Sequence, residues 1–342
     1  MFIVIDGSAL LTTHYYGSLP VELKGHKESD NTEAYKLIKN NGKGIYVNGV
    51  ESALYSIFEI IKNNPVDKLV VCFDKSRNTF RRELYSGYKA NRPEKPIPLK
   101  QQFDTLQDIL NHIGIKTLVS DKYEADDLAG SVIEYFKNPF ENTYFITKDH
   151  DWFQLIDDSN NVKGLIICNS DEKAFELRSK YDFLNENNPF EDSELKLPTK
   201  MVCFDEYAVQ NLDGVKPCQI PDKKGFAGDK SDNIPGIFKV GDSTAISLLS
   251  KFETMDDFYS KYEEMDDKEF ISMLKKLHIG DKTIINLIEN KNNAMLSRQL
   301  ALIIKDCNEI SLDYNDYNIN IDYDLLRKVI KYYHLDSLER FL

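Results

Sequence analysis

The chain opens with Phe2-Ile3-Val4-Ile5-Asp6-Gly7, a short apolar run that stops at an aspartate. No basic flank precedes this run and no small-residue cleavage pattern follows it, so we interpret it as a buried strand rather than a leader peptide. Four more runs rich in β-branched or aromatic residues follow, at 68–73, 115–119, 144–146 and 165–167. Stretches with apolar residues at helical spacing lie between them, at 50–62, 99–112 and 125–136. Strands that alternate with helices predict an α/β fold with a mainly parallel central sheet.

The length of 342 residues exceeds the usual range of one domain, so we expect a large α/β body with a smaller helical part. Strand patterns give way to helical patterns in the second half, which predicts a body over 1–205 and a helical lobe over 206–305. The remaining segment, 306–342, begins with an acidic run and is expected to pack back on the body. Two polar segments, about 17–48 and 170–200, have the character of surface insertions.

The five cysteines are scattered without a Cys-X-X-Cys spacing, and their odd number argues against a disulfide framework and a zinc site. This usage indicates a reducing compartment. No stretch approaches the roughly 20 apolar residues that a membrane-crossing helix needs. We therefore expect a soluble, cytoplasmic protein without a membrane partner.

The formal net charge is −13, which by itself argues against a nucleic-acid partner because phosphate binding depends on lysine and arginine. The charge is unevenly distributed, however. Between residues 75 and 100 the chain carries eight basic residues and two acidic ones, so this window is locally +6. The basic window is a candidate phosphate-binding surface, although a solvated face is the plainer interpretation of the window alone.

Carboxylates follow the predicted strands where the sheet should open: Asp6, Asp74, Glu124, Asp126, Asp127, Asp149 and Asp151. Asp229 and Asp232 form a later group. Each acid taken singly could cap a helix or belong to a turn. Together they need positive charge nearby, because like charges about 4 Å apart repel by roughly 4 kcal/mol at an effective dielectric constant near 20. Oxygen ligands without histidine or thiolate indicate hard cations such as Mg²⁺ or Mn²⁺, two of which could act on a phosphodiester.

A second feature follows directly after Asp232. Gly236 and Gly241 flank the apolar Ile237 and Val240 before a helical stretch at 243–251. This spacing predicts a compact hairpin whose backbone N–H groups can face a phosphate, helped by the helix dipole.

With these features in place, the chain resembles the 5′-nuclease family that includes the N-terminal domain of bacterial DNA polymerase I, phage 5′-exonucleases and flap endonucleases. Five segments carry the resemblance in the family's order: Val4-Ile5-Asp6-Gly7, Cys72-Phe73-Asp74, Tyr123-Glu124-Ala125-Asp126-Asp127, Thr147-Lys148-Asp149-His150-Asp151 and Gly228-Asp229-Lys230-Ser231-Asp232-Asn233-Ile234-Pro235-Gly236. The resemblance implies a PIN-like nuclease domain, followed by a helical lobe with a helix-hairpin-helix motif over 228–252. Since the chain ends at Leu342, it also implies a stand-alone nuclease without a polymerase.

The resemblance further implies a site for two Mg²⁺ ions, with Mn²⁺ as a substitute. The ligands implied for the first ion are Asp6, Asp74, Glu124 and Asp126, and those for the second ion are Asp126, Asp149, Asp151 and Asp232. Asp127 and Asp229 would support these ligands from behind. The catalytic residues implied are Asp74, Asp126, Asp149, Lys89 and Arg92.

The basic window matches the family's helical arch, about 75–100, through or under which a 5′ single strand passes. Lys89 would lean over the scissile phosphate, Arg92 would assist, and Tyr88 would stack on a base. The implied DNA-binding residues are Arg77, Arg81, Arg82, Tyr88, Lys89, Arg92, Gly236, Lys239 and Gly241. The hairpin would grip the duplex and could hold K⁺, although Phe238 stands here in place of the family's lysine.

The function implied is a structure-specific 5′-nuclease, a 5′-3′ exonuclease and flap endonuclease of DNA replication and repair. Its partner would be DNA with 5′ flaps, nicks or branched ends, and we expect a monomer. Two alternatives stay open: a junction-binding DNA scaffold with little activity, and a PIN-type ribonuclease, which would not require the glycine hairpin.

Overall fold

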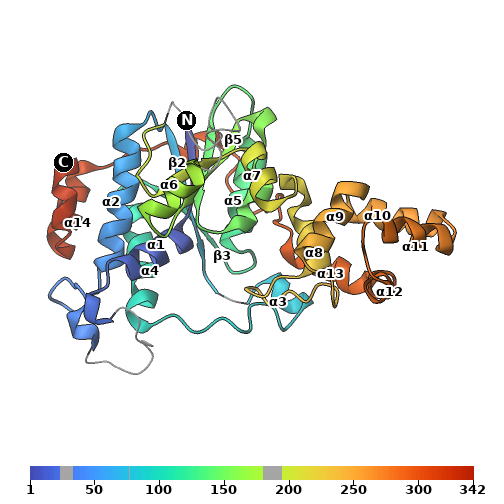
Figure 1. Cartoon of the computed structure of the whole chain (residues 1–342). Coiled ribbons are helices and arrows are strands. Elements are labelled where there is room, and N and C mark those ends of the chain that lie inside the picture. The colour runs from blue at the N-terminus through green and yellow to red at the C-terminus, as the bar shows by residue number, and fades with distance from the viewer. Residues whose placement is uncertain (24–33, 77, 180–194) are drawn as a thin grey trace.

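A six-stranded sheet lies between two layers of helices in the computed structural model, which describes residues 1–23, 34–76, 78–179 and 195–342 (Figure 1). The strand order is β3-β2-β1-β4-β5-β6. Strands β1 to β5 pair in parallel, whereas β6 runs antiparallel to β5. The strands are β1 (Phe2–Asp6), β2 (Lys68–Asp74), β3 (Lys116–Ser120), β4 (Thr143–Thr147), β5 (Val162–Ile167) and β6 (Met201–Phe204). The predicted α/β fold with a mainly parallel sheet is confirmed.

Alternate residues of β1 face opposite sides of the sheet, because successive side chains of a strand point in opposite directions. Phe2 and Val4 belong to one cluster of buried apolar residues, and Ile3 and Ile5 belong to another. The helices around the sheet are α1 (Gly7–Gly17), α2 (Asn48–Asn63), α3 (Phe80–Leu84), α4 (Ile97–His112), α5 (Ala125–Phe136), α6 (Asp171–Ser179) and α7 (Glu206–Asp213). Helices α1, α2 and α4 pack with Ile3 and Ile5, whereas α5 packs with Phe2 and Val4. Both faces of the sheet are therefore covered.

The sequence patterns located most of these elements. The five predicted strands and the three predicted helices, which correspond to α2, α4 and α5, all occur, with ends shifted by a few residues. The edge strand β6 was not predicted. It is only four residues long and follows a charged segment, so its apolar run gave no periodic signal.

One of the two predicted surface insertions contributes residues to the core. In the described part of 17–48, the side chains of Leu19, Leu23, Tyr35 and Ile38 are buried in the cluster around Ile3. In the described part of 170–200, Ala174 is the buried residue of α6, and the other residues of this helix are exposed or half-buried. The prediction of a simple surface excursion was therefore wrong for the described part of 17–48, because those apolar residues are buried in the core, and it stays a prediction for 170–200. Residues 24–33 and 180–194 lie outside the described residues.

A helical lobe extends away from the sheet (Figure 1). Its helices are α8 (Ile220–Ala227), α9 (Asp242–Phe252), α10 (Met255–Glu264), α11 (Asp267–Lys276), α12 (Asp281–Glu289) and α13 (Lys291–Ala301). The rings of Phe252 and Phe270 lie 5.2 Å and 5.4 Å from that of Phe258, measured between centroids. An aromatic cluster thus joins α9, α10 and α11.

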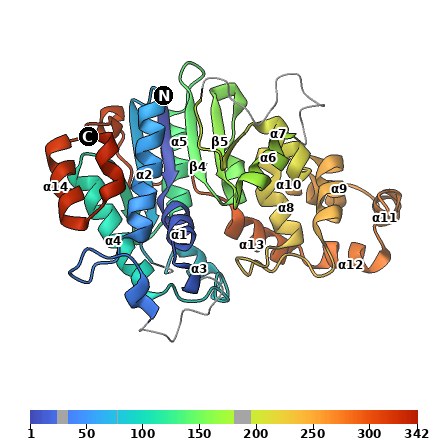
Figure 2. The same ribbon diagram turned by 60° about the vertical axis from the view of Figure 1, so that its left-hand side comes forward.

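The C-terminal segment returns to the body, where it forms α14 (Tyr323–Tyr333) beside α2 and α4 and then a short 3-10 helix, η8 (Asp336–Phe341) (Figure 2). The backbone N–H of Ile319 donates to the carbonyl of Asp67 over 3.0 Å. The Ser337 hydroxyl donates to Glu51 over 2.9 Å. Leu326 and Ile330 of α14 are buried in the cluster around Ile3, so this segment completes that face of the body.

The strand order determines where a ligand can bind. The chain adds β2 and β3 on one side of β1 and then crosses to add β4 and β5 on the other side. In open α/β sheets the ligand lies outside the carboxyl ends of the strands at such a switch point. Among the described residues, no helix combines the length and apolar character that a membrane span requires.

Candidate active site

Four of the predicted acids meet at the carboxyl edge of the sheet. Asp6 ends β1, Asp74 ends β2, Asp149 follows β4, and Asp126 lies in the first turn of α5. All four line one cavity of about 1080 Å³. The parallel pairing of β1, β2 and β4 is what brings together acids that are far apart in the sequence.

Hydrogen bonds fix the orientation of these carboxylates. Asp6 accepts from the Ala9 N–H and from the Thr147 hydroxyl, both over 2.8 Å. Asp74 accepts from the Ala125 N–H over 3.0 Å. The Trp152 indole N–H donates to Asp126 over 2.7 Å. Asp6, Asp74 and Asp126 are thus each held by a neighbouring element, which pre-organises the group.

The cavity acids disfavour one another's negative charge. Burial raises the pKa of Asp6 to about 7, and the nearby Asp74 and Asp149 also raise it. Burial likewise raises the pKa of Asp126, and Asp149, Asp74 and Asp6 add to the effect. Buried carboxylates that repel one another stabilise a positive ion between them, and an all-oxygen donor set fits a hard divalent cation.

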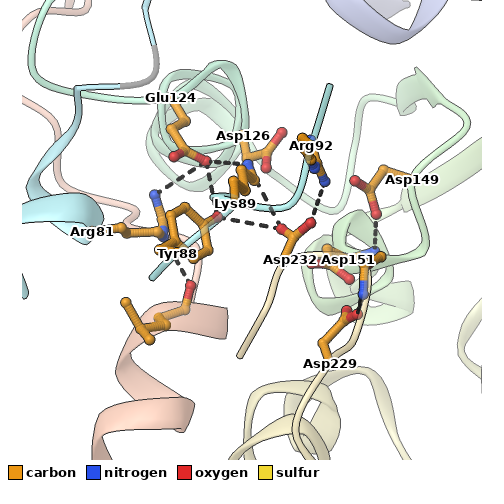
Figure 3. A network of polar contacts seen from close by, with 12 residues as sticks. Arg81, Tyr88, Lys89, Arg92, Glu124, Asp126, Asp149, Asp151, Asp229 and Asp232 are labelled. Atoms are coloured by element: carbon orange, nitrogen blue, oxygen red, sulfur yellow. Dashed lines mark hydrogen bonds and ion pairs between the residues drawn. The ribbon is translucent and has the colours of Figure 1, made fainter. Parts of the chain in front are cut away.

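Two outer acids are paired with side chains of the basic window (Figure 3). Glu124 accepts from Lys89 Nζ over 2.7 Å and from the Thr79 hydroxyl over 3.0 Å. Burial opposes its charge, but Lys89 and Arg81 more than offset this and lower the pKa of Glu124 to about 2. Asp232 accepts from Arg92 and lies 3.7 Å from Lys89 Nζ. These contacts join the basic window to the acid cluster.

A third outer acid, Asp151, is paired with Lys224 of α8. Lys224 also donates to Asp229 over 2.6 Å, so it bridges two of the predicted acids. Lys224 was not among the site residues predicted from the sequence. The only available signal was its position just over one helical turn before Asp229, and that spacing does not reveal Asp151, which is distant in the sequence.

The arrangement of the outer acids bears on ion binding. In this conformation no three histidine, cysteine, aspartate or glutamate side chains of the described residues converge on a common ion position. Glu124 and Asp232 instead point toward Lys89 and Arg92 (Figure 3). Asp151 is paired with Lys224. The donor chemistry fits divalent ions, and ligation by the outer acids requires an exchange of these ion pairs.

The long segment between α3 and α4 (Figure 1) is docked by hydrogen bonds on the turn at Asp232. The backbone N–H of Lys89 donates to the carbonyl of Asp232 over 2.8 Å, and Asn233 Nδ2 donates to the carbonyl of Gly87 over 2.6 Å. Lys89 has a φ of 51°, an uncommon conformation for a residue with a side chain. A second cavity of about 710 Å³ lies beside the first, and Lys89, Arg92 and Lys95 line both. The segment therefore lies between the two cavities.

The structure corrects the prediction that Arg81 contacts DNA. Arg81 is 2% exposed and donates two hydrogen bonds of 2.7 Å to Asp127. It also donates to the carbonyls of Leu300 and Leu302, at the end of α13. Arg81 thus ties α3 to α5 and to the helical lobe, and its buried guanidinium is not accessible to a phosphate.

The other arch residues differ in their accessibility. Tyr88 is only 4% exposed and its hydroxyl donates to Glu124 over 3.2 Å, so the predicted base stacking is wrong for this conformation. Arg82 lines the second cavity and is accessible there. Arg77 lies outside the described residues.

Asp127 and Glu124 form a reciprocal cap at the start of α5. The backbone N–H of Glu124 donates to Asp127 over 3.1 Å, and the side chain of Glu124 accepts from the backbone of Asp127 in return. Because Asp127 also holds Arg81, it anchors the backbone that carries Glu124 and Asp126.

The glycine hairpin is built between α8 and α9. Gly236 has a φ of 59°, and a Cβ atom there would lie 2.2 Å from the Gly228 nitrogen, so only glycine fits. Its N–H donates to the Ser297 hydroxyl over 2.9 Å, which corrects the prediction that this amide faces a phosphate. Gly241, at the start of α9, has open space beside it, and Lys239 is exposed. The second half of the hairpin, with Lys239 and Gly241, is therefore the part that can contact a duplex.

Two family models match the chain. The model of the 5′-3′ exonuclease N-terminal resolvase-like domain matches residues 1–183, and that of the 5′-3′ exonuclease C-terminal SAM fold matches residues 215–323. The 5′-3′ exonuclease of Buchnera aphidicola subsp. Acyrthosiphon pisum is 30% identical over 304 residues, which cover 89% of this chain and 86% of that protein. DNA polymerase I of Streptococcus pneumoniae is 28% identical over 77% of this chain and 25% of its own length.

Solved structures share the fold at low sequence identity. T5 5′-exonuclease with bound divalent metal ions (zinc) has a TM-score of 0.56 and 17% identity, covering 99% of this chain and 96% of that chain. The catalytic core of Rad2 in complex with a DNA substrate has a TM-score of 0.53 and 15% identity, covering 99% of this chain and 90% of that chain. These structures support the same overall architecture.

Proposed function

The chain belongs to the 5′-3′ exonuclease family and is a metal-dependent nuclease, and on that premise we propose that it cuts DNA at 5′ flaps, nicks and branched ends. The proposal rests on one observation, which is that an acidic cavity and a basic segment lie against each other. Asp6, Asp74, Asp126 and Asp149 line the cavity, and Lys89 reaches into the same space. Acids that hold cations beside a lysine that binds phosphate are the parts that phosphodiester hydrolysis needs.

Two Mg²⁺ ions, with Mn²⁺ as a substitute, are proposed at the ligand sets given by the resemblance. When bound, such ions activate water and stabilise the charge of the phosphodiester. The protein's own contribution is orientation: Thr147 and Trp152 hold Asp6 and Asp126 in place through their hydrogen bonds. Lys89 and Arg92 supply positive charge to the phosphate once they leave Glu124 and Asp232.

The cavity suggests a path for the single strand. Besides the acids, the cavity is lined by residues of α1 and by basic side chains, which are Lys89, Arg92, Lys95, Lys148 and Lys200. We propose that the 5′ strand runs through this cavity under the segment that carries Lys89, while Lys239 and Gly241 contact the duplex backbone.

Several finer assignments remain proposals. These are the division into a nuclease domain over 1–205, a helical lobe over 206–305 and a C-terminal segment over 306–342, a monomeric state, a cytoplasmic location, and a K⁺ ion at the hairpin. Size-exclusion chromatography with light scattering, which measures the molar mass in solution, tests the monomeric state.

A cleavage assay tests the proposed function directly. The purified protein is incubated with a 5′-flap DNA, a nicked duplex and a single-stranded RNA, each with Mg²⁺ or with a chelator. We expect Mg²⁺-dependent cutting near the junction of the flap DNA. Binding of the flap without cleavage would favour a scaffold, and preferred cleavage of the RNA would favour a PIN-type ribonuclease; either result contradicts the proposal.

Replacement of Lys89 by alanine is expected to lower turnover on flap DNA on the order of 100-fold, with a smaller change in KM, because one charge that stabilises the transition state is lost. Lys100→Ala is the matched control, since Lys100 belongs to the same basic window but pairs with Glu94 at the surface. Single-turnover kinetics at saturating enzyme measure the effect. Unchanged turnover with weakened binding would move Lys89 from catalysis to anchoring.

A further inference from the structure

Lys224 is a cation of the acid cluster that comes from the helical lobe rather than from the basic window. Its Nζ atom donates to Asp151 and, over 2.6 Å, to Asp229. Its side chain is 18% exposed, so the ion pairs are largely shielded from water. The lysine thus lies beside Asp151, one of the acids proposed as ligands of the second ion.

The two carboxylates hold Lys224 unequally. Asp229 also accepts from the N–H and the hydroxyl of Ser231, over 2.7 Å and 2.6 Å, and although burial opposes its charge, Lys224 and these bonds lower the pKa of Asp229 to about 2. Among the described residues, the carboxylate of Asp151 accepts from Lys224 and from no second donor. Asp229, which accepts three hydrogen bonds, is therefore the fixed partner, and Asp151 is the one that can exchange the lysine for an ion.

We propose that Lys224 is a positioning residue that competes with the second divalent ion for Asp151 and stays on Asp229 when that ion binds. The inference rests on the proposed function, because it needs the second ion to use Asp151. An ammonium group and a divalent ion repel each other when they share one carboxylate. Lys224 then weakens the binding of the second ion relative to that of the first. The role of Asp229 is to hold the lysine.

The chain offers a matched control on the same helix. Lys223 precedes Lys224, is similarly shielded at 12% exposure, and pairs with Asp213 over 3.1 Å. Its replacement removes the same charge from α8 without removing a contact to Asp151. A general electrostatic effect should therefore appear in Lys223→Met as well, whereas competition for Asp151 should appear only in Lys224→Met.

Binding of Mn²⁺ to the wild type and to both variants, measured by electron paramagnetic resonance and calorimetry without DNA, tests the proposal. We expect two classes of site in the wild type. In Lys224→Met the weaker class should bind about tenfold more tightly, with the stronger class unchanged, because the competing charge is gone. In Lys223→Met both classes should remain as in the wild type. A weaker class that is unchanged or loosened in Lys224→Met, or equal shifts in both variants, would overturn the proposal.

Asp229→Asn supplies a reciprocal test. Without its fixed partner, Lys224 has only Asp151, so the weaker class should loosen by several-fold in this variant. In Lys224→Met/Asp229→Asn, that loosening should disappear relative to Lys224→Met alone, because Asp229 acts through the lysine. Loosening of the same size in both backgrounds would contradict this role for Asp229. Melting temperatures in chelator establish that each variant is folded.

The binding experiment separates this inference from the proposed function. Wild-type protein that binds fewer than two Mn²⁺ ions would overturn the role of Lys224, while cleavage of flap DNA still decides the proposed function. Wild-type protein that binds two ions and cleaves flap DNA, with no selective change in Lys224→Met, would overturn only the role of Lys224. Two-site binding with the expected change, but without cleavage of flap DNA, would overturn the proposed function and leave the role of Lys224 supported.

Discussion

Arg81→Met is expected to lower the free energy of unfolding by about 3–5 kcal/mol, because it removes one partner of a buried ion pair and leaves the other uncompensated. The uncompensated group is Asp127, which is fully buried. The variant also leaves the carbonyls of Leu300 and Leu302 without their donor. Urea denaturation followed by circular dichroism measures the change.

The adjacent Arg82→Met is the control for this prediction. Arg82 is half-buried and lines the second cavity, so its loss should change stability little but should weaken DNA binding. The opposite pattern, with normal stability and weakened DNA binding in Arg81→Met, would restore the DNA contact inferred from the sequence and contradict the buried anchor.

Asp126→Asn is expected to reduce cleavage of flap DNA by about three orders of magnitude or more, because metal stabilisation of the reacting charge contributes several kcal/mol and each 1.36 kcal/mol is about tenfold. Asp126 belongs to both proposed ligand sets, so one substitution affects both ions. The amide keeps the shape of the carboxyl group and can still accept from the Trp152 indole N–H.

Stability gives an independent readout for the same variant. Burial and the repulsion of Asp149 and Asp74 disfavour charge at Asp126, so a neutral amide should not lower the melting temperature in chelator. Asp324→Asn serves as the control, since Asp324 lies exposed on α14, far along the chain from the acid cluster, and pairs with Arg327 over 2.9 Å. Cleavage that survives in Asp126→Asn, or a melting temperature that falls, would contradict the assigned role.

Much of the fold followed from local patterns. The strands and helices of the body were predicted because apolar periodicity is a property of neighbouring residues, and a buried parallel strand has a distinctive run such as Phe2–Asp6. The grouping of Asp6, Asp74 and Asp149 followed as well, since parallel strands place their carboxyl ends at one edge. β6 and the core residues within 17–48 were missed because their signals are short and depend on distant partners.

The orientation of individual side chains could not be predicted from local sequence patterns. The basic window marked a phosphate-binding segment, yet Arg81 points inward to Asp127 and Tyr88 to Glu124. Charge in a sequence does not distinguish a cation that faces DNA from one that neutralises a buried acid, because both need the same residue types.

Residue type and local order were therefore enough to predict five of the six strands, the edge at which the acids meet and the class of cation that the acids would bind. Tertiary structure alone decided how the charges are paired: Lys89 with Glu124, Arg92 with Asp232, and Lys224 with Asp151 and Asp229. The physical reason is that buried charges must be compensated by whatever group the fold brings within reach, and that group can be far away along the chain.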